Sequence, residues 1–258
     1  MSAGSLSPSV PSWYGVAASV ALVAIAFFVV LREHLGLGRE VLVAAARAAV
    51  QLVAVGALLL VLFRHTGLPG ALAWVTAMVV LAGRVAGGRA KGLPHATRVA
   101  TVGIAAGAAA TLGLLLVARV IDTSGRVVVP VGGMVVTGAM QGASLTLQRM
   151  RDEAATARRT VEARLALGLA SGAAFAPHLR TALRTALIPA IDGTKVVGLI
   201  SLPGATVGLL LAGVNPLTAI RYQVVVMYML LGAAAVAGVV AGRLGVRTMF
   251  DDAHRLRA

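Results

Sequence analysis

The chain has 258 residues, of which 59% are hydrophobic and only 12% are charged. An average soluble domain has roughly 45–50% apolar and about 25% charged residues, so this composition excludes an ordinary water-soluble enzyme. Lys and Arg number 23 against nine Asp and Glu, which gives a net charge of +14. Such a charge favours a nucleic-acid partner in a soluble protein. Basic residues beside apolar segments instead set membrane orientation, so we expect no nucleic acid.

Seven apolar segments follow one another along the chain, most of them close to the roughly 20 helical residues that cross a bilayer. They cover residues 13–31, 41–63, 69–85, 99–117, 127–147, 194–211 and 216–241. The third and sixth segments are short and interrupted by glycine. We therefore predict an all-α, polytopic integral membrane protein with about seven transmembrane helices, embedded in lipid, in which residues 1–258 form a single transmembrane domain.

The distribution of basic residues predicts how these segments are oriented. With the N-terminus outside, 17 of the 23 Lys and Arg fall on inside segments and four fall on outside segments. An excess of basic residues in the loops marks the cytoplasmic side. The predicted topology is therefore N-terminus out and C-terminus in.

One inside segment, residues 149–192, is far longer than the usual 2–8 residues between helices. Its halves, residues 151–167 and 176–191, place charges on one face of an apolar helical pattern, which predicts two amphipathic helices. A glycine-rich bend at 168–172 joins them. Two helices lying in the lipid headgroups are one interpretation. We favour a docking element for a partner protein, because surface binding does not explain the bend.

Polar and helix-breaking residues inside the apolar segments mark a candidate substrate path. Arg47 lies within the second apolar segment, where a positive charge costs free energy in lipid. Such an arginine can have a purely structural role. Met134 can be a soft metal ligand but more often such a residue packs. Proline and glycine in short apolar segments indicate bent or unwound helices, where transporters bind substrate. The path candidates are Arg47, Gln51, Met134, Gln141, Ser201, Tyr222 and Gln223, and the candidate helix breaks are Pro130, Pro203, Gly204 and Pro216.

The chain lacks the motifs of a catalytic or ATP-binding protein. No G-x-x-x-x-G-K-[ST] sequence occurs to cradle ATP phosphates, and cysteine is absent. No nucleophile and base can be paired within the apolar segments, so we assign no catalytic residue. Apart from Asp192 at its edge, the apolar core holds no carboxylate of the kind that ion-coupled carriers use. We therefore expect a membrane subunit that is no enzyme and holds no cofactor, with ATP and Mg²⁺ bound by a partner ATPase.

The sequence Glu162-Ala163-Arg164, with Gly168 six residues after Glu162, resembles the signature by which ABC permeases engage their ATPase. More widely, the chain resembles the bacterial iron-export ABC permeases of the FetB type, a family that includes plant aluminium-tolerance permeases. The segments that carry the resemblance are 38–52, 129–134, 162–168, 186–189, 195–204 and 212–223.

This resemblance implies an ATP-driven exporter of iron, or of another metal ion, in the bacterial inner membrane. It implies a permease homodimer that works with separate ATP-binding subunits. It also implies that Glu162, Arg164 and Gly168 dock the ATPase.

Two departures from the family's pattern bear on the cargo. Thr137-Gly138 stands where the family usually has Gly-Asn, and Ala205-Thr206 stands where it usually has a methionine pair. Losing two methionines removes soft metal ligands, so the metal ligands stay unassigned. An ABC permease for an organic cargo, such as a nucleotide sugar, and a stand-alone membrane carrier are the alternatives.

Overall fold

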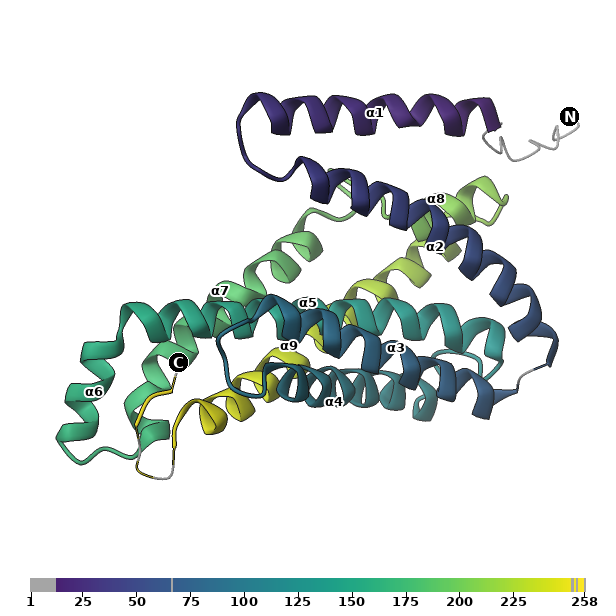
Figure 1. Ribbon diagram of the computed structural model, residues 1–258. Coiled ribbons are helices and arrows are strands. Elements are labelled where there is room, and N and C mark those ends of the chain that lie inside the picture. Colours follow the sequence, from purple (N-terminus) through teal and green to yellow (C-terminus); the bar gives the residue numbers. More distant parts are fainter. Residues whose placement is uncertain (1–12, 66, 252, 254, 258) are drawn as a thin grey trace, which may run out of the picture. The chain divides into compact units, whose positions relative to one another are not determined.

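The computed structural model describes residues 13–65, 67–251, 253 and 255–257. In this part of the chain nine α-helices form, and two isolated bridge pairs are the sole β-type pairing. The predicted all-α class is confirmed. The helices divide between two compact units (Figure 1). The first unit comprises the described part of Met1–Thr66 with Gly208–Val214, and the second comprises the described part of Gly67–Val207 with Asn215–Ala258.

The first unit is built around the helical hairpin of α1 (Trp13–Arg32) and α2 (Gly38–His65). Gly36 lies in the connecting turn with a φ of +71°, a conformation that glycine adopts without steric cost. Gly38 lies against the ring of Phe27, so a Cβ there would stand 3.0 Å from the ring. α1 buries no residue within the chain, so its apolar surface is free to face lipid.

The second unit contains four long helices that pack against one another and three further helices. The long helices are α3 (Leu68–Arg89), α4 (Ala96–Val117), α5 (Gly125–Thr156) and α9 (Pro216–Met249). The others are α6 (Arg158–Ala166), α7 (Ser171–Val196) and α8 (Gly204–Leu211), the last of which continues into the first unit.

Glycines allow the long helices of the second unit to approach closely. A Cβ on Gly142 of α5 would overlap the backbone of Ala234 on α9. On α4, a Cβ on Gly103 or Gly107 would stand 2.9 Å and 2.7 Å from the α9 carbonyl oxygens of Ala237 and Ala233. Without water between the helices, such small-residue contacts supply much of the packing energy in a membrane.

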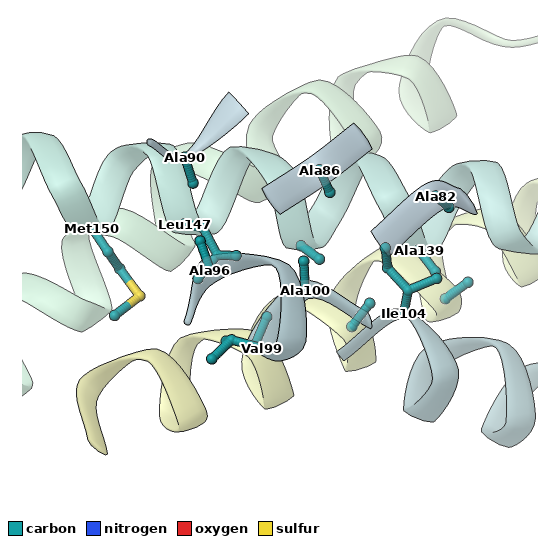
Figure 2. Packing of buried hydrophobic residues seen from close by; sticks show 14 of the residues in the cluster. Ala82, Ala86, Ala90, Ala96, Val99, Ala100, Ile104, Ala139, Leu147 and Met150 are labelled. Carbon is teal, nitrogen blue, oxygen red and sulfur yellow. The ribbon is translucent and has the colours of Figure 1, made fainter. Parts of the chain in front are cut away.

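The core between these helices consists mainly of small apolar side chains. Figure 2 shows how α3, α4 and α5 contribute alanines to it, with a few larger side chains between them. Ile104, Leu147 and Met150 are fully buried. The labelled core residues are Ala82, Ala86, Ala90, Ala96, Val99, Ala100, Ile104, Ala139, Leu147 and Met150. Close helix spacing follows from this composition, because alanine keeps the backbones near each other.

Five helices of the described chain are long and apolar enough to cross a membrane: α1, α3, α4, α5 and α9. They contain the predicted segments 13–31, 69–85, 99–117, 127–147 and 216–241. α2 contains the predicted segment 41–63 and is 28 residues long. The chain is thus a polytopic membrane protein.

The predicted sixth segment, residues 194–211, is not one continuous helix, and the interruption lies beside the candidate breaks Pro203 and Gly204. α7 ends at Val196, and the chain leaves helical structure until α8 begins at Gly204. α8 has eight residues, which at 1.5 Å per residue reach about 12 Å. This is less than half of the roughly 30 Å hydrocarbon core. The cause is local: Gly198 has a φ of +84°, and Pro203 lacks the N–H that a continuing helix needs.

Pro130 is predicted to bend or break a helix, and it does not break one, because α5 continues through this residue. Pro130 is the sixth residue of α5, so its missing N–H removes a single bond to the first turn. Gly132 lies against Val75 of α3, where a Cβ would stand 2.5 Å from a methyl group. This glycine therefore serves helix packing rather than a bend.

The predicted helix over 151–167 is divided in two. Residues up to Thr156 extend α5, and α6 begins at Arg158 after the turn at Ala157. Met150 and Ala154 are fully buried, which holds the end of α5 against the core. The predicted second helix, 176–191, lies within α7.

Candidate functional site

An unwound segment, residues 197–203, interrupts the helical path between α7 and α8. The Gly198 N–H donates to the Ser201 carbonyl at 3.0 Å, which closes a tight turn. Leu199 and Ile200 at its tip are exposed, as is Ser201. Pro203 immediately precedes α8, where it leaves no helical hydrogen bond unmade.

The start of α9 is fixed by a helix cap at the next candidate break. The Asn215 side chain accepts a hydrogen bond from the Leu217 N–H at 3.0 Å. Pro216 occupies the first helical turn, where its missing N–H costs nothing and its fixed φ suits the helix. The helix boundaries at Pro203, Gly204 and Pro216 therefore lie where the sequence places proline and glycine.

Two neighbouring cavities open beside the unwound segment, within the second unit. Their volumes are about 360 Å³ and 410 Å³, and they share Thr194, Val197 and Met227 as lining residues. Gln141 and Ser201 line the larger cavity. We call the smaller one, lined by Thr206 and Gln223, the Gln223 cavity.

A buried hydrogen bond crosses the wall of the Gln223 cavity. The Thr206 hydroxyl donates to the Gln223 Oε1 at 2.6 Å, and the two residues are 1% and 4% exposed. The Gln223 Nε2 is buried and has no hydrogen-bond partner. An unmade hydrogen bond on a buried amide costs roughly 1–3 kcal/mol, so this amide can gain by binding a ligand.

The structure brings three of the predicted path residues together: Gln141, Ser201 and Gln223 line the two cavities. Met134 instead packs against the hydrophobic core. Tyr222 lies on α9 with 37% of its surface exposed and lines neither cavity.

Arg47 and Gln51 lie on α2 in the first unit, where both are exposed. They remain path candidates by prediction, because their place relative to the cavities is not defined.

Thr206 is the site residue that sequence reasoning missed as a path candidate. The sequence did contain an indication of this role, because Thr206 and Thr137 occupy the two positions at which the chain departs from the family's usual pattern. Thr137 lines the larger cavity and Thr206 lines the Gln223 cavity. Both departures therefore change the chemistry of cavity walls.

The segment from Arg158 to Ala174 folds into a short helix and a tight turn, which we call the docking segment. Glu162 and Arg158 pair at 2.9 Å on the surface of α6. The Arg164 Nη1 donates to the Ala174 carbonyl at 3.1 Å and so ties α6 to α7. Gly168 ends α6 with a φ of +85°, and the bond from the Leu169 N–H to the Arg164 carbonyl completes the cap.

Contacts with neighbouring helices hold the docking segment in place. Val161 is its fully buried residue on α6. Glu153 of α5 and His178 of α7 lie 3.0 Å apart and are both largely buried, which joins the two helices behind the segment. The arrangement leaves the Glu162 carboxylate accessible on a supported surface.

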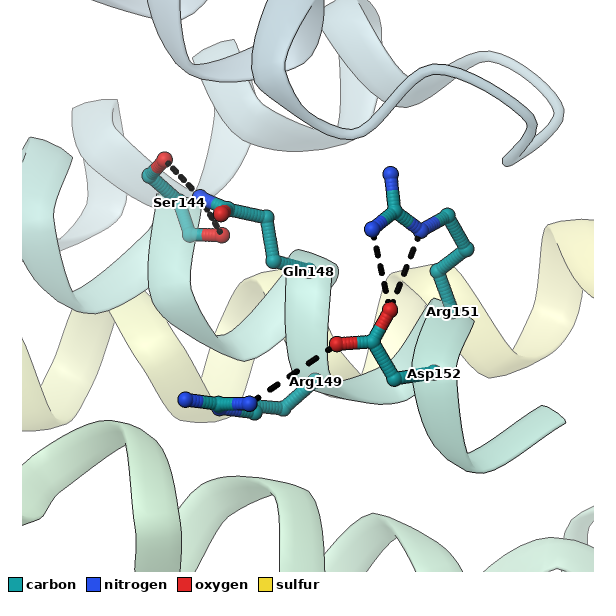
Figure 3. A network of polar contacts seen from close by, with 5 residues as sticks. All are labelled: Ser144, Gln148, Arg149, Arg151 and Asp152. Carbon is teal, nitrogen blue, oxygen red and sulfur yellow. Dashed lines mark hydrogen bonds and ion pairs between the residues drawn. The ribbon is translucent and has the colours of Figure 1, made fainter. Parts of the chain in front are cut away.

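Figure 3 shows the polar contacts on α5 just before the docking segment. The Asp152 carboxylate lies 2.9 Å from Arg151 and 3.8 Å from Arg149. One turn or so earlier, the Gln148 Nε2 donates to the Ser144 hydroxyl at 2.9 Å. The exposed ion pairs of Asp152 with Arg149 and Arg151 each stabilise the fold by at most about 1 kcal/mol. Their charges therefore remain available to a partner.

Segments predicted to be cytoplasmic meet at one end of the second unit. A Cβ on Gly92, in the basic turn between α3 and α4, would stand 3.7 Å from the Arg151 side chain. Phe250, after α9, packs edge-on against Phe175 of α7 with ring centroids 6.3 Å apart. Three separate parts of the chain thus gather their basic residues at the same end.

At the end of α9, residues 249–251 pair with residues 255–257 and Phe250 lies opposite Leu256; we call these paired residues the C-terminal hairpin. The Arg255 N–H donates to the Asp251 Oδ1 at 2.7 Å, and the Arg255 side chain contacts the other carboxylate oxygen at 2.9 Å. The backbone hydrogen bond from Arg255 is the main reason that the pKa of Asp251 lies below its ordinary value.

We expect acid to release this hairpin. A lowered folded pKa means that the Asp251 contacts stabilise the hairpin above the ordinary value of 3.8, and that this contribution is lost as the pH falls through the lowered value. Asp251→Asn removes the charge at every pH. At neutral pH its Arg255 and Arg257 amides should exchange with solvent faster than in the wild type, as hydrogen exchange can measure. Equal protection, with Asp122→Asn as control, would contradict the role of the charge.

Geometry and composition together define a polytopic helical membrane protein with uncharged cavities beside an unwound segment. No solved structure matches the chain. The sequence profile of an uncharacterised protein family, UPF0014, matches residues 13–250, and the chain belongs to this family.

Curated relatives match over nearly the whole chain. UPF0014 membrane protein STAR2 of Oryza sativa subsp. japonica is 39% identical over 93% of this chain and 84% of its own length. Protein ALUMINUM SENSITIVE 3 of Arabidopsis thaliana is 34% identical, covering 93% and 88%. The "probable iron export permease protein FetB" of Escherichia coli strain K12 is 32% identical, covering 93% of each. The predicted resemblance to this family is confirmed.

Proposed function

We propose that this chain is the membrane permease subunit of an ATP-driven ABC exporter that moves iron, or another metal ion, out of the cytoplasm. The observation that carries the proposal is the match to the iron export permease over 93% of both chains. In this proposal the chain is not itself an enzyme and holds no cofactor. ATP and Mg²⁺ bind to a separate subunit.

The proposed topology has seven crossings in the inner membrane of a bacterium, with the N-terminus outside and residues 1–258 acting as one permease domain. It is supported by the basic turn of α3 and α4, the docking segment and the residues after α9, which gather at one end of the second unit. Basic residues favour the cytoplasmic side. α7 and α8 with the unwound segment between them form the sixth crossing as a discontinuous helix, which a membrane tolerates where the unwound backbone faces protein or a water-filled cavity.

The proposed mechanism couples ATP hydrolysis to movement of helices. Two permease copies form the path, and an ATPase presses on the docking segment of each through Glu162, Arg164 and Gly168. Because α7 leads directly from this segment to the unwound residues, a push on its first turn reaches the cavities through one continuous helix. Such helix shifts can switch a path between inward-open and outward-open states.

Transport in vesicles tests this function. The permease is purified with the ATP-binding subunit that accompanies it and reconstituted so that the docking segment faces outward. We expect ATP-dependent accumulation of radioactive iron, and none with ADP. Accumulation of a nucleotide sugar instead of iron would favour the organic cargo. Transport that survives without ATP or any accompanying ATPase would favour a stand-alone carrier.

A further inference from the structure

The described lining of the two cavities is mainly apolar, and the polar residues in it are uncharged. No Asp, Glu, Lys, Arg or His occurs among these residues. Asp192 is close in sequence, but its carboxylate pairs with Lys195 at 3.1 Å and both side chains are more than half exposed. The uncharged polar lining residues are Thr137, Gln141, Thr194, Ser201, Thr206, Gln223 and Tyr228.

This lining is unsuited to a bare metal ion. Hard divalent cations are bound by carboxylates, and softer ones by histidine, thiolate or the methionine thioether. Met227 is the one thioether in the described lining, and a single soft ligand cannot replace the hydration shell of an ion. In the described residues no three His, Cys, Asp or Glu come together in a way that could hold a metal. An ion that enters such an uncharged cavity loses the free energy of its hydration, and the lining does not compensate for most of this loss.

Gln223 indicates what the cavity can bind instead. Its Oε1 already accepts the hydrogen bond from Thr206, whereas its Nε2 is buried and unpaired. An amide nitrogen can only donate, so the missing partner is an acceptor oxygen. The Thr206 bond already occupies the Oε1 side of the amide, so the Nε2 is the part of Gln223 that can still gain a partner.

We propose that the Gln223 cavity binds an uncharged, oxygen-rich ligand, so that a metal cargo passes as a neutral complex enclosed in oxygen ligands rather than as a bare ion. The Gln223 Nε2 donates to a ligand oxygen of the complex. The charge of the metal is then compensated by its own ligands before it leaves water. This inference rests on the proposed function, because it specifies the form of the exported metal.

Binding of two iron probes to the complete permease in lipid nanodiscs tests the inference. The first probe is tris(acetohydroxamato)iron(III), a neutral complex with six oxygen ligands, and the second is ferrous chloride kept reduced. We expect the wild type to bind the neutral complex more tightly than the ferrous ion. Gln223→Met keeps the length of the side chain but removes the donor, and should weaken binding of the complex about threefold to tenfold.

Two further variants make the test specific. Gln148→Leu removes a glutamine whose amide already bonds to Ser144 on α5 and should leave binding unchanged. Gln223→Glu replaces the donor with a carboxylate, and should weaken binding of the complex while strengthening binding of the ferrous ion. Each variant is accepted only if its size-exclusion profile matches that of the wild type.

The outcomes separate this inference from the proposed function. Equal affinity of the wild type and Gln223→Met for the complex overturns the inference, as does tighter binding of the ferrous ion than of the complex by the wild type. If ATP-driven transport of ferrous ion persists unchanged in Gln223→Met, the exporter function stands and the neutral complex is rejected. If neither iron probe is transported with ATP, the exporter function itself fails.

Discussion

Gly142→Ala should destabilise the permease strongly, although it adds one methyl group to the chain. The new Cβ would overlap the backbone of Ala234, including its Cα at 2.7 Å. A backbone cannot rotate away as a side chain can, so α5 and α9 must move apart. Overpacking of this kind costs about 1–3 kcal/mol or more. A marked fall in the midpoint of thermal unfolding, followed by fluorescence-detected size exclusion, is the expected result.

Gly232→Ala is the matched control on the partner helix. No atom lies within 4 Å of the position that its Cβ would occupy. Alanine is favoured over glycine in a helix by about 1 kcal/mol, so this variant should be as stable as the wild type or more so. If the two variants melt alike, close contact of α5 and α9 is not what holds the second unit together.

The positions of the long helices along the chain could be predicted from the sequence, because they depend on the length of local apolar segments. Each of α1, α3, α4, α5 and α9 contains a predicted segment, since some 20 apolar residues are enough to define a crossing in lipid. The polar residues of the cavities were harder to find. Gln223 was visible as a polar residue in an apolar helix, whereas Thr206 acquires its role only through a bond to a residue 17 positions away.

Proline and glycine were ambiguous in the sequence, because the same residues either break a helix or permit close packing. The chain is unwound up to Pro203 and becomes helical again at Gly204, but Pro130 and Gly132 lie within a continuous α5. What decides between these outcomes is a neighbour that the local sequence does not contain. Gly132 faces Val75, so α3 stabilises the helix at the place where the sequence suggests a break.

The boundaries of the docking segment depend on long-range contacts in the same way. Sequence periodicity predicted one helix over residues 151–167 and did not indicate the turn at Ala157. That turn allows Ala154 on α5 and Val161 on α6 both to be buried. The end of α6 was easier to predict, because Gly168 provides the positive φ that its cap requires.

Glu162→Lys should reduce ATP-driven transport at least tenfold while leaving the permease folded. The Glu162 carboxylate is about half exposed, and its pair with Arg158 at 2.9 Å contributes at most about 1 kcal/mol. Reversing its charge therefore costs little stability. At an interface, however, placing like charges together costs several kcal/mol. A partner surface that fits Glu162 would be repelled by lysine, so the ATPase would no longer move the docking segment.

Three measurements distinguish lost coupling from lost folding. Thermal unfolding of Glu162→Lys should match the wild type, retention of the ATP-binding subunit during purification should fall, and transport should fall with it. Asp122→Lys makes the same charge change on an exposed residue between α4 and α5 and should affect none of the three. Glu162→Gln, which keeps the shape but not the charge, should lie between. Full transport by Glu162→Lys would show that the ATPase docks elsewhere, since no partner surface could accept both charges equally well.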